Sequence, residues 1–298
     1  MAGETGPIQV SLPIALVIVA FFGIALYNTV EIFIWVFCIF RSRRGLYFWS
    51  MLVAIFGIFI HAIAVFLRFF GLAPNFPMCV VTVLGWWCMV TGQSVVLYSR
   101  LGLVVSDPTK LRFVRYMIIT NFCILHIPVS ILFLASNSGN EAPFIGAFNV
   151  YEKIQLAGFS IQESIISGLY LWEATSALKP ILAVKGAEGR RMIRHLAILF
   201  VVTVVLDSSL IATEYTNHFQ IQTTYKPVVY SIKLKIEFII LNELLAFTRL
   251  SIGNFNSLDI QSGDSPHSYP GAVILADGVG NNASEDHIFD GRYHTPNV

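Results

Sequence analysis

Hydrophobic residues along this chain gather in seven long stretches that short polar clusters separate. An α-helix rises about 1.5 Å per residue, so about 20 mostly apolar residues cross the roughly 30 Å hydrocarbon core of a bilayer. Each stretch comes close to that length or exceeds it. They cover residues 12–40, 46–70, 78–98, 114–136, 154–178, 196–213 and 227–248. The pattern predicts an all-α fold class: a polytopic membrane protein built as a seven-transmembrane-helix bundle.

The polar clusters between the stretches predict short loops, which favour antiparallel packing of neighbouring helices. Pro227 is predicted to open the seventh helix. Composition strengthens the membrane assignment, because 55% of the residues are hydrophobic and only 12% are charged, against roughly 25% charged in an average soluble domain. The lipid bilayer is therefore the first partner that the sequence predicts.

Lysine and arginine are distributed unevenly among the predicted loops. Twelve of them follow the first, third and fifth stretches, whereas the loops on the other side hold only Lys153 and Lys226. Cytoplasmic loops of membrane proteins carry the excess of Lys and Arg. We therefore predict a short extracellular N-terminus (residues 1–11), a membrane domain (residues 12–249) and a cytoplasmic C-terminus, in the plasma membrane.

Residues 250–298 differ in composition from the rest of the chain. They hold six acidic residues and many Gly, Ser, Asn and Pro, which predicts a disordered acidic cytoplasmic tail. The net charge of +1 gives no reason to expect a nucleic-acid partner. Cys38, Cys79, Cys88 and Cys123 lack the spacing of a metal site, so we expect no metal and no cofactor.

The seventh stretch carries Lys233, Lys235 and Glu237 inside an otherwise apolar segment. On a biological insertion scale a charge at the centre of a helix costs about 2.5–3.5 kcal/mol, so these residues need partners inside the bundle. Polar residues at similar depth in other stretches are the candidates. Together these residues form a candidate polar core for a ligand: Glu31, His61, Gln162, Glu163, Asp207, Lys233, Lys235 and Glu237.

Helical geometry sorts the charges of the seventh stretch by face. Lys233 and Glu237 are four residues apart and share a face, whereas Lys235 points about 200° away from Lys233. We expect Lys233 to pair with Glu237, and Lys235 to need either an acid from another helix or a water-filled cavity. The candidates for that acid are Glu163, Asp207 and Glu31. Two interpretations stay open: the charges form a ligand or ion site, or they hold the helices together and do nothing more.

A second group of polar residues lies where helices are predicted to leave the membrane on the cytoplasmic side. Arg100 ends the third stretch, and Arg190 and Arg191 belong to the third basic loop. These positions suit contact with a cytoplasmic signalling protein, and the positive-inside rule alone also explains them. The candidate coupling residues are Tyr98, Ser99, Arg100, Arg190 and Arg191.

Four segments carry a family resemblance: TGQSVVLYSRLGLV, FSIQESIISGLYLWE, VVLDSSLIATEY and YKPVVYSIKLKIEFIILNELL. Together they resemble an uncharacterised family of fungal integral membrane proteins, with a domain of unknown function, seven predicted spans and a layout similar to that of G-protein-coupled receptors. The resemblance covers residues 12–250. It implies the architecture and a fungal origin, and it supplies neither a ligand nor an activity.

These observations favour a seven-transmembrane, receptor-like protein that senses a small-molecule ligand at a fungal membrane. The alternative is a transporter or channel for small solutes or ions such as protons, in which the intramembrane charges line the path. We do not expect an enzyme, because the histidines and Asp207 lack the spacing of a zinc hydrolase.

Overall fold

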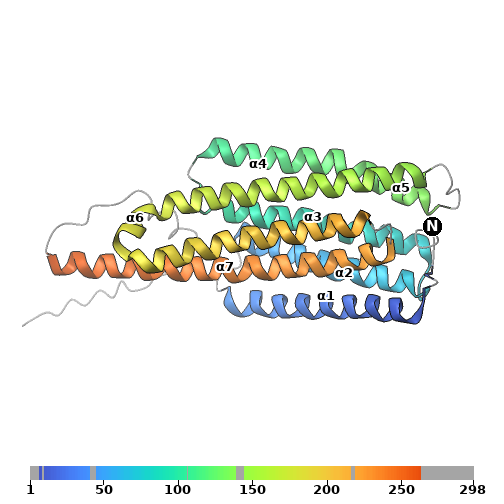
Figure 1. The fold of residues 1–298 in the computed structure, drawn as a ribbon, viewed down its shortest axis with the longest axis horizontal. Coiled ribbons are helices and arrows are strands. Elements are labelled where there is room, and N and C mark those ends of the chain that lie inside the picture. The colour runs from blue at the N-terminus through green and yellow to red at the C-terminus, as the bar shows by residue number, and fades with distance from the viewer. Residues whose placement is uncertain are drawn as a thin grey trace, which may run out of the picture.

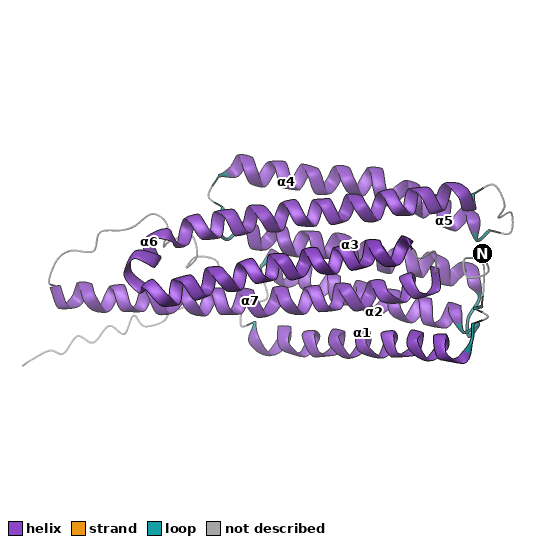
Figure 2. Cartoon of the chain, viewed as in Figure 1, coloured by secondary structure: helices purple, strands orange, loops and turns teal. Residues whose placement is uncertain are grey.

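A computed structural model of the chain describes residues 7–8, 10–40, 45–105, 107–138, 144–215 and 219–262. Nearly all of them are helical, and the described residues include no strand (Figure 2). The elements in chain order are α1 (Leu12–Ile39), α2 (Leu46–Phe69), α3 (Asn75–Leu101), α4 (Pro108–Asn121), the π-helical turn η1 (Phe122–His126), α5 (Ile127–Ser136), α6 (Ile145–Tyr215) and α7 (Phe219–Ser262). The predicted all-α fold class is confirmed.

Five helical segments among the described residues are long and apolar enough to cross a membrane. They are α1, α2, α3, the continuous rod of α4, η1 and α5 (Pro108–Ser136), and the second part of α6 (Gly189–Tyr215). These segments indicate a multi-pass membrane protein in a lipid bilayer, as the sequence predicts. The first part of α6 and α7 contain more charged residues, and several of these belong to the candidate site.

α6 turns back on itself instead of running straight (Figure 1). In a straight helix Glu163 and Asp207 would be separated by about 66 Å. Both carboxylates instead contact the ammonium group of Lys233. The two limbs of α6, one before and one after the turn, therefore lie side by side next to α7. The loop predicted between the fifth and sixth stretches is wrong, because the backbone stays helical there.

The bundle has two ends, which are visible in Figure 1. Its N-terminal end gathers the end of α2, the start of α3 and the start of α7, and the N–H of Ile8 binds the carbonyl of Phe69 there at 3.0 Å. Its C-terminal end carries the start of α2, the end of α3 and the turn of α6. Residues 1–6 lie outside the described range, and the orientation of the two ends in the membrane stays a prediction.

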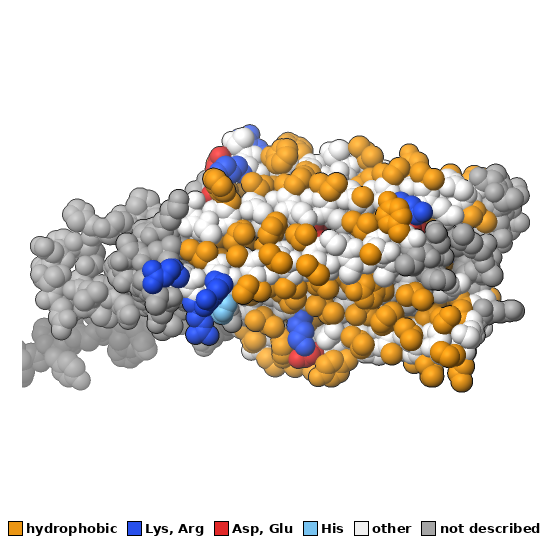
Figure 3. Space-filling model, viewed as in Figure 1, with side chains coloured by type: hydrophobic (Ala, Val, Ile, Leu, Met, Phe, Trp, Pro, Cys, Tyr) orange, Lys and Arg blue, Asp and Glu red, His pale blue; other side chains and the backbone are white. Residues whose placement is uncertain are grey.

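Outward-facing side chains are mostly large and apolar. Trp172, for example, is 70% exposed, and hydrophobic side chains cover much of the visible face between the two ends (Figure 3). Lys and Arg side chains gather near the C-terminal end (Figure 3), where Arg190 and Arg191 are exposed. An apolar belt of this kind fits the acyl chains of a bilayer.

α2 and α3 approach each other closely because glycines stand at their contact. A Cβ atom added to Gly57 would lie 2.3 Å from the backbone nitrogen of Met89, and one added to Gly85 would lie 2.6 Å from that of His61. Gly92, seven residues after Gly85, meets the backbone of α2 in the same way. Small residues permit this proximity in membrane bundles. The contact holds His61 firmly against α3.

α7 differs from the predicted seventh stretch at both ends. It begins at Phe219, so Pro227 lies inside the helix instead of opening it, and Lys226 is buried instead of lying in a loop. A proline inside a membrane helix is tolerated because neighbouring groups bind the freed backbone. α7 also continues to Ser262, so the first part of the predicted tail is helical. Residues 263–298 lie outside the described range, and their disorder stays a prediction.

Candidate functional site

The face of α7 that points into the bundle carries four ionisable residues in a row, which we call the α7 stripe. Lys226, Tyr230, Lys233 and Glu237 follow each other at intervals of four, three and four residues, so they share one face of the helix. All four side chains are buried. At the rise of an α-helix the α7 stripe extends over about 16 Å, roughly half the thickness of a hydrocarbon core.

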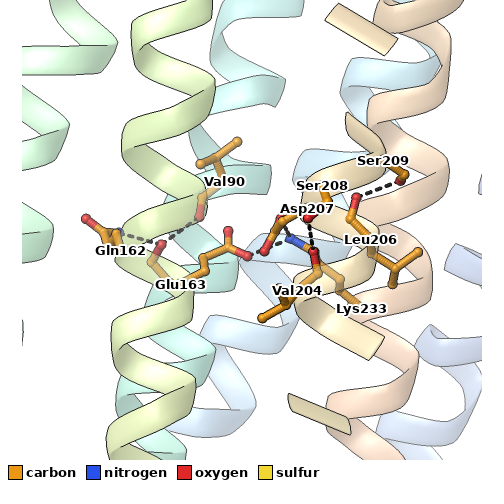
Figure 4. Close-up of polar contacts among 10 residues, drawn as sticks. Val90, Gln162, Glu163, Val204, Leu206, Asp207, Ser208, Ser209 and Lys233 are labelled. Carbon is orange, nitrogen blue, oxygen red and sulfur yellow. Dashed lines mark hydrogen bonds and ion pairs between the residues drawn. The ribbon is translucent and has the colours of Figure 1, made fainter. Parts of the chain in front are cut away.

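The ammonium group of Lys233, near the centre of the α7 stripe, and the carboxylates of Glu163 and Asp207 form a cluster, which we call the central cluster. Lys233 donates one hydrogen bond to Oε2 of Glu163 at 2.8 Å and another to Oδ1 of Asp207 (Figure 4). Glu163 belongs to the first limb of α6 and Asp207 to the second. One ammonium group therefore joins three helical segments in the interior. Loss of that ammonium would leave two carboxylates without their counter-ion.

Glu237 pairs with Arg100 of α3, so the predicted pair between Lys233 and Glu237 is wrong. The guanidinium carbon of Arg100 lies 3.9 Å from the ring centroid of Tyr170. Only 3% of Arg100 is exposed, so its side chain points into the bundle. Arg100 therefore differs from the expectation that it faces a cytoplasmic partner. Charges on facing helices meet across the interior, whereas residues four apart on one helix meet only along its surface.

Lys235 finds its acid at the edge of the bundle. Its ammonium lies 2.6 Å from Oε2 of Glu31 in α1 and 5.2 Å from the centroid of a ring of Trp35. The side chains of Lys235 and Glu31 are 27% and 22% exposed. Of the three acids expected from the sequence, Glu31 is the partner. The pair is neutral and peripheral, so Lys235 contributes little to an interior site.

Gln162, next to Glu163 in the sequence, connects three helices by hydrogen bonds. Its Nε2 donates to Oγ of Ser94 in α3 at 2.8 Å, and its Oε1 accepts from Nδ2 of Asn121 in α4 at 2.7 Å. These contacts fix the rotation of the first limb of α6. Gln162 therefore positions the carboxylate of Glu163 toward α7 instead of contributing a charge itself.

The N-terminal part of the α7 stripe belongs to a second polar cluster, which was not predicted from the sequence. Glu152 accepts hydrogen bonds from Lys226 at 2.6 Å and from Gln222 at 3.1 Å, and Gln222 also donates to Glu214. These residues lie at or beyond the ends of the apolar stretches, so they looked like loop residues. The spacing of seven between Lys226 and Lys233, which is two helical turns, was the signal that could have found them.

A cavity of about 40 Å³ lies beside this second cluster, near the N-terminal end of the bundle. Residues of α2, α3, α5, α6 and α7 line it. The polar lining residues are His61, Thr82, Glu152, Thr223 and Lys226. The aromatic lining residues are Trp86, Phe133, Phe148 and Phe219. Of the predicted polar core, His61 alone borders this cavity.

Two polar atoms of the cavity lining are buried without a hydrogen-bond partner: Nε2 of His61 and Oγ1 of Thr223. The other ring nitrogen of His61, Nδ1, lies 3.2 Å from the carbonyl oxygen of Thr82. Buried polar atoms are nearly always hydrogen-bonded, and exceptions call for an explanation such as a ligand or an ordered water. The cavity therefore has the features of a binding site.

The remaining coupling residues lie at the C-terminal end. Tyr98 and Ser99 are partly exposed at the end of α3, and Arg190 and Arg191 are exposed on the second limb of α6. Unlike Arg100, these four are accessible from outside the bundle. Within the described ranges no three His, Cys, Asp or Glu side chains gather as metal ligands would.

A family model described as a domain of unknown function (DUF7703) matches residues 5–258. The match covers nearly the whole described bundle, including the central cluster and the cavity. No curated protein and no solved structure matches the chain. The comparisons therefore establish the family and leave the activity to be inferred from the site.

Proposed function

The chain belongs to the DUF7703 family, whose domain has no assigned function, and from its site we propose that it is a receptor-like sensor of a fungal plasma membrane. Seven helical segments cross the bilayer in this proposal, with the N-terminal end of the bundle outside and the C-terminal end in the cytoplasm. A small ligand binds in the cavity near the N-terminal end. α7 carries the response to the other end.

One observation supports this proposal above the others: the α7 stripe touches the cavity at one end and Arg100 at the other. Lys226 lines the cavity, Lys233 binds both limbs of α6, and Glu237 pairs with α3. Well-packed apolar residues often replace buried ion pairs without loss of stability. The buried charges of the α7 stripe therefore favour a bundle that changes between two conformations. They are less expected in a bundle in which they only stabilise the packing of the helices.

The size of the cavity links ligand binding to movement of α7. Sites for drug-sized ligands have volumes of about 300–1,000 Å³, whereas this cavity has about 40 Å³. A ligand of more than a few atoms must therefore separate groups that now touch, and the pair of Lys226 and Glu152 forms one wall. Pro227 follows Lys226 directly, and prolines are where membrane helices bend. Binding at the cavity thus favours a different bend of α7.

The exposed basic residues at the C-terminal end suit the partner that such a sensor needs. Arg190 and Arg191 project from the second limb of α6, whose Asp207 binds Lys233 of the α7 stripe. Movement of α7 therefore reaches the surface that carries these arginines. A cytoplasmic signalling protein with an acidic surface fits there by charge complementarity.

A ligand screen on the purified full-length protein in lipid nanodiscs tests this proposal. A compound that binds only the folded state stabilises it by about 2.7 kcal/mol at a hundred times its Kd. We expect Thr223→Val, which exchanges a cavity hydroxyl for a methyl group, to weaken the stabilisation by a genuine ligand. Thr203→Val is the matched control, because Thr203 is buried in α6 and does not line the cavity. Equal stabilisation of both variants contradicts the cavity as the ligand site.

The second candidate is a transporter or channel, and the charged groups at successive depths along α7 favour it. In this case the α7 stripe lines a path for small cations or protons. Reconstitution in liposomes distinguishes the two functions. A transporter shows flux that Lys233→Met abolishes, whereas a receptor shows no flux in either protein.

A further inference from the structure

The buried charges around Lys233 do not balance. Glu163 and Asp207 both pair with the ammonium of Lys233, and their side chains are 1% and 6% exposed. Glu237, about one turn further along α7, pairs with Arg100. This group therefore contains three carboxyl groups and two cations. One negative charge is left over when every acid is ionised.

The other cations of α7 are already paired with acids of their own. In the part of the chain that the structure describes, Lys226 pairs with Glu152 and Lys235 pairs with Glu31. Neither ammonium is free to neutralise a second acid. Burying an uncompensated charge away from water is costly, so the extra negative charge at Lys233 calls for another cation.

One oxygen of the central cluster lacks a partner. Oδ1 of Asp207 accepts from Lys233, whereas Oδ2 is buried without a hydrogen bond, and only 4% of Asp207 is exposed. Glu163 has a second donor beside it, the hydroxyl of Tyr230. The amide of Gln162 donates to α3 and serves neither acid. Asp207 is therefore the acid with fewer donors.

The two carboxyl groups of the central cluster lie close together. Oε2 of Glu163 is 2.8 Å from Nζ of Lys233, and Oδ1 of Asp207 contacts the same nitrogen (Figure 4). Two charge-assisted hydrogen bonds to one nitrogen place these oxygens no more than about 6 Å apart. Two acids that share a site away from water commonly hold one proton between them, because both negative charges together are unfavourable.

A proton fits this position better than a metal ion does. A metal ion usually takes roughly four or more ligands, whereas Lys233 already occupies the position between the two carboxyl groups. Among the described residues no set of three His, Cys, Asp or Glu side chains has the geometry of metal ligands. A proton needs only one oxygen, and Oδ2 of Asp207 is available.

We propose that the central cluster binds one proton, on Oδ2 of Asp207, while Glu163 stays ionised and balances Lys233. The proton comes from water, and an O–H bond forms on the carboxylate. Loss of the proton would leave a net negative charge between the two limbs of α6 and α7, where the carboxylates repel each other. The packing of α6 on α7 therefore depends on pH, at a site separate from the cavity.

The groups around Asp207 identify the charge that retains the proton. Among the described residues, Glu163 of α6 and Tyr230 and Lys233 of α7 are the titratable side chains that face its carboxyl group. The nearby pair of Arg100 and Glu237 is neutral as a whole. Glu163 is the negative charge beside Asp207, so neutralising Glu163 should release the proton.

Infrared spectroscopy of the full-length protein in nanodiscs at neutral pH tests the inference, because the C=O stretch of a protonated carboxyl is separate from that of a carboxylate. We expect a carboxylic-acid band in the unmodified protein, and the loss of one group's intensity in both Asp207→Asn and Glu163→Gln. Glu31→Gln is the matched control, because Glu31 pairs with Lys235 at the edge of the bundle, and it should keep the band. An unmodified protein without the band, or full intensity in either variant, overturns the inference.

The pH dependence of stability is a second readout. An unfolded Asp is ionised above about pH 6, so a proton held only by the folded protein makes stability fall as pH rises. From about pH 6 to 8 the equilibrium constant for folding should fall by up to about tenfold per pH unit relative to Asp207→Asn. Denaturant unfolding in detergent micelles measures this slope, and Glu163→Gln serves if Asp207→Asn does not fold. Equal slopes in the unmodified protein and the variant overturn the inference.

The inference goes beyond the proposed function and does not rest on it. The infrared band and the pH slope report the proton whether or not a compound binds at the cavity. A genuine cavity ligand, found for a protein that lacks the band, contradicts the proton and keeps the receptor. The band in a protein whose cavity binds nothing keeps the proton and contradicts the receptor.

Discussion

The contact between α2 and α3 and the contacts of α7 hold the same bundle together by opposite means. Between α2 and α3, Gly57 and Gly85 allow the two backbones to come into direct contact, and this close contact fixes the position of one helix against the other. Along α7, Lys226, Lys233 and Glu237 bind charged groups on facing helices, and such groups can exchange partners. From this difference we infer that α2 and α3 form a rigid frame, and we propose that α7 moves against it.

The largest effect is expected at the central cluster. Lys233→Met leaves Glu163 and Asp207 buried without their counter-ion, which should lower the free energy of unfolding by about 3–5 kcal/mol. Lys110→Met is the matched control, because the Lys110 side chain of the pair with Glu173 is 44% exposed and surface pairs contribute about 1 kcal/mol or less. Denaturant unfolding in detergent micelles measures both. Equal losses in the two variants contradict the central position of Lys233.

The next effect tests the rigid frame. A Cβ at Gly57 would collide with the backbone of α3, so Gly57→Ala should lower the free energy of unfolding by about 1–3 kcal/mol, the usual effect of overpacking. Gly23→Ala in α1 is the control, because no atom lies within 4 Å of its added Cβ. Thermal unfolding of both purified variants is the measurement. A stable Gly57→Ala protein would show that α2 and α3 can separate freely.

A double-mutant cycle measures how strongly α7 holds α3. Arg100→Met, Glu237→Gln and the double variant should give a coupling energy of about 0.5–3 kcal/mol, as for other contacting residues. The double variant should be more stable than the sum of the single losses predicts, because neither charge is then left alone. Strictly additive losses contradict the pair.

The smallest effect is expected at the surface. Lys110 of α4 lies 2.5 Å from Glu173 of α6, and the Lys110 side chain is 44% exposed. Solvent and salt screen such a pair, so Lys110→Met should leave the thermal midpoint unchanged within error. A clear loss that added salt abolishes would show that surface charges, and not only the α7 stripe, hold the limbs of α6 in place.

The sequence predicts the first two helices to within one residue, because their apolar stretches end where polar loops begin. The predicted boundaries are wrong for α6 and α7, because these two helices continue into polar segments. The side chains of Glu152 and Lys226 in these segments are buried by contacts with other helices, which apolar patterning does not reveal. Glu152 and Lys226 looked like loop residues for this reason.

The members of the central cluster were predictable, whereas their pairing was not. Glu163, Asp207 and Lys233 stand out as charges at similar depth in apolar stretches. Which of them meet depends on how each helix is rotated about its axis, and the hydrogen bonds of Gln162 help set that rotation for α6. These contacts join residues that are far apart in the sequence, so spacing along one helix favoured the wrong partner, Glu237, for Lys233.

Distance measurements between two spin labels test most directly whether α7 connects the cavity with the C-terminal end. The labels replace the exposed residues Trp172 of α6 and Ile239 of α7 in a protein whose four cysteines are changed to alanine. Lys226→Met breaks the cavity pair about 20 Å from residue 239 along the helix. We expect it to shift the distance distribution, whereas Lys235→Met should not. An unchanged distribution in Lys226→Met would contradict a moving α7.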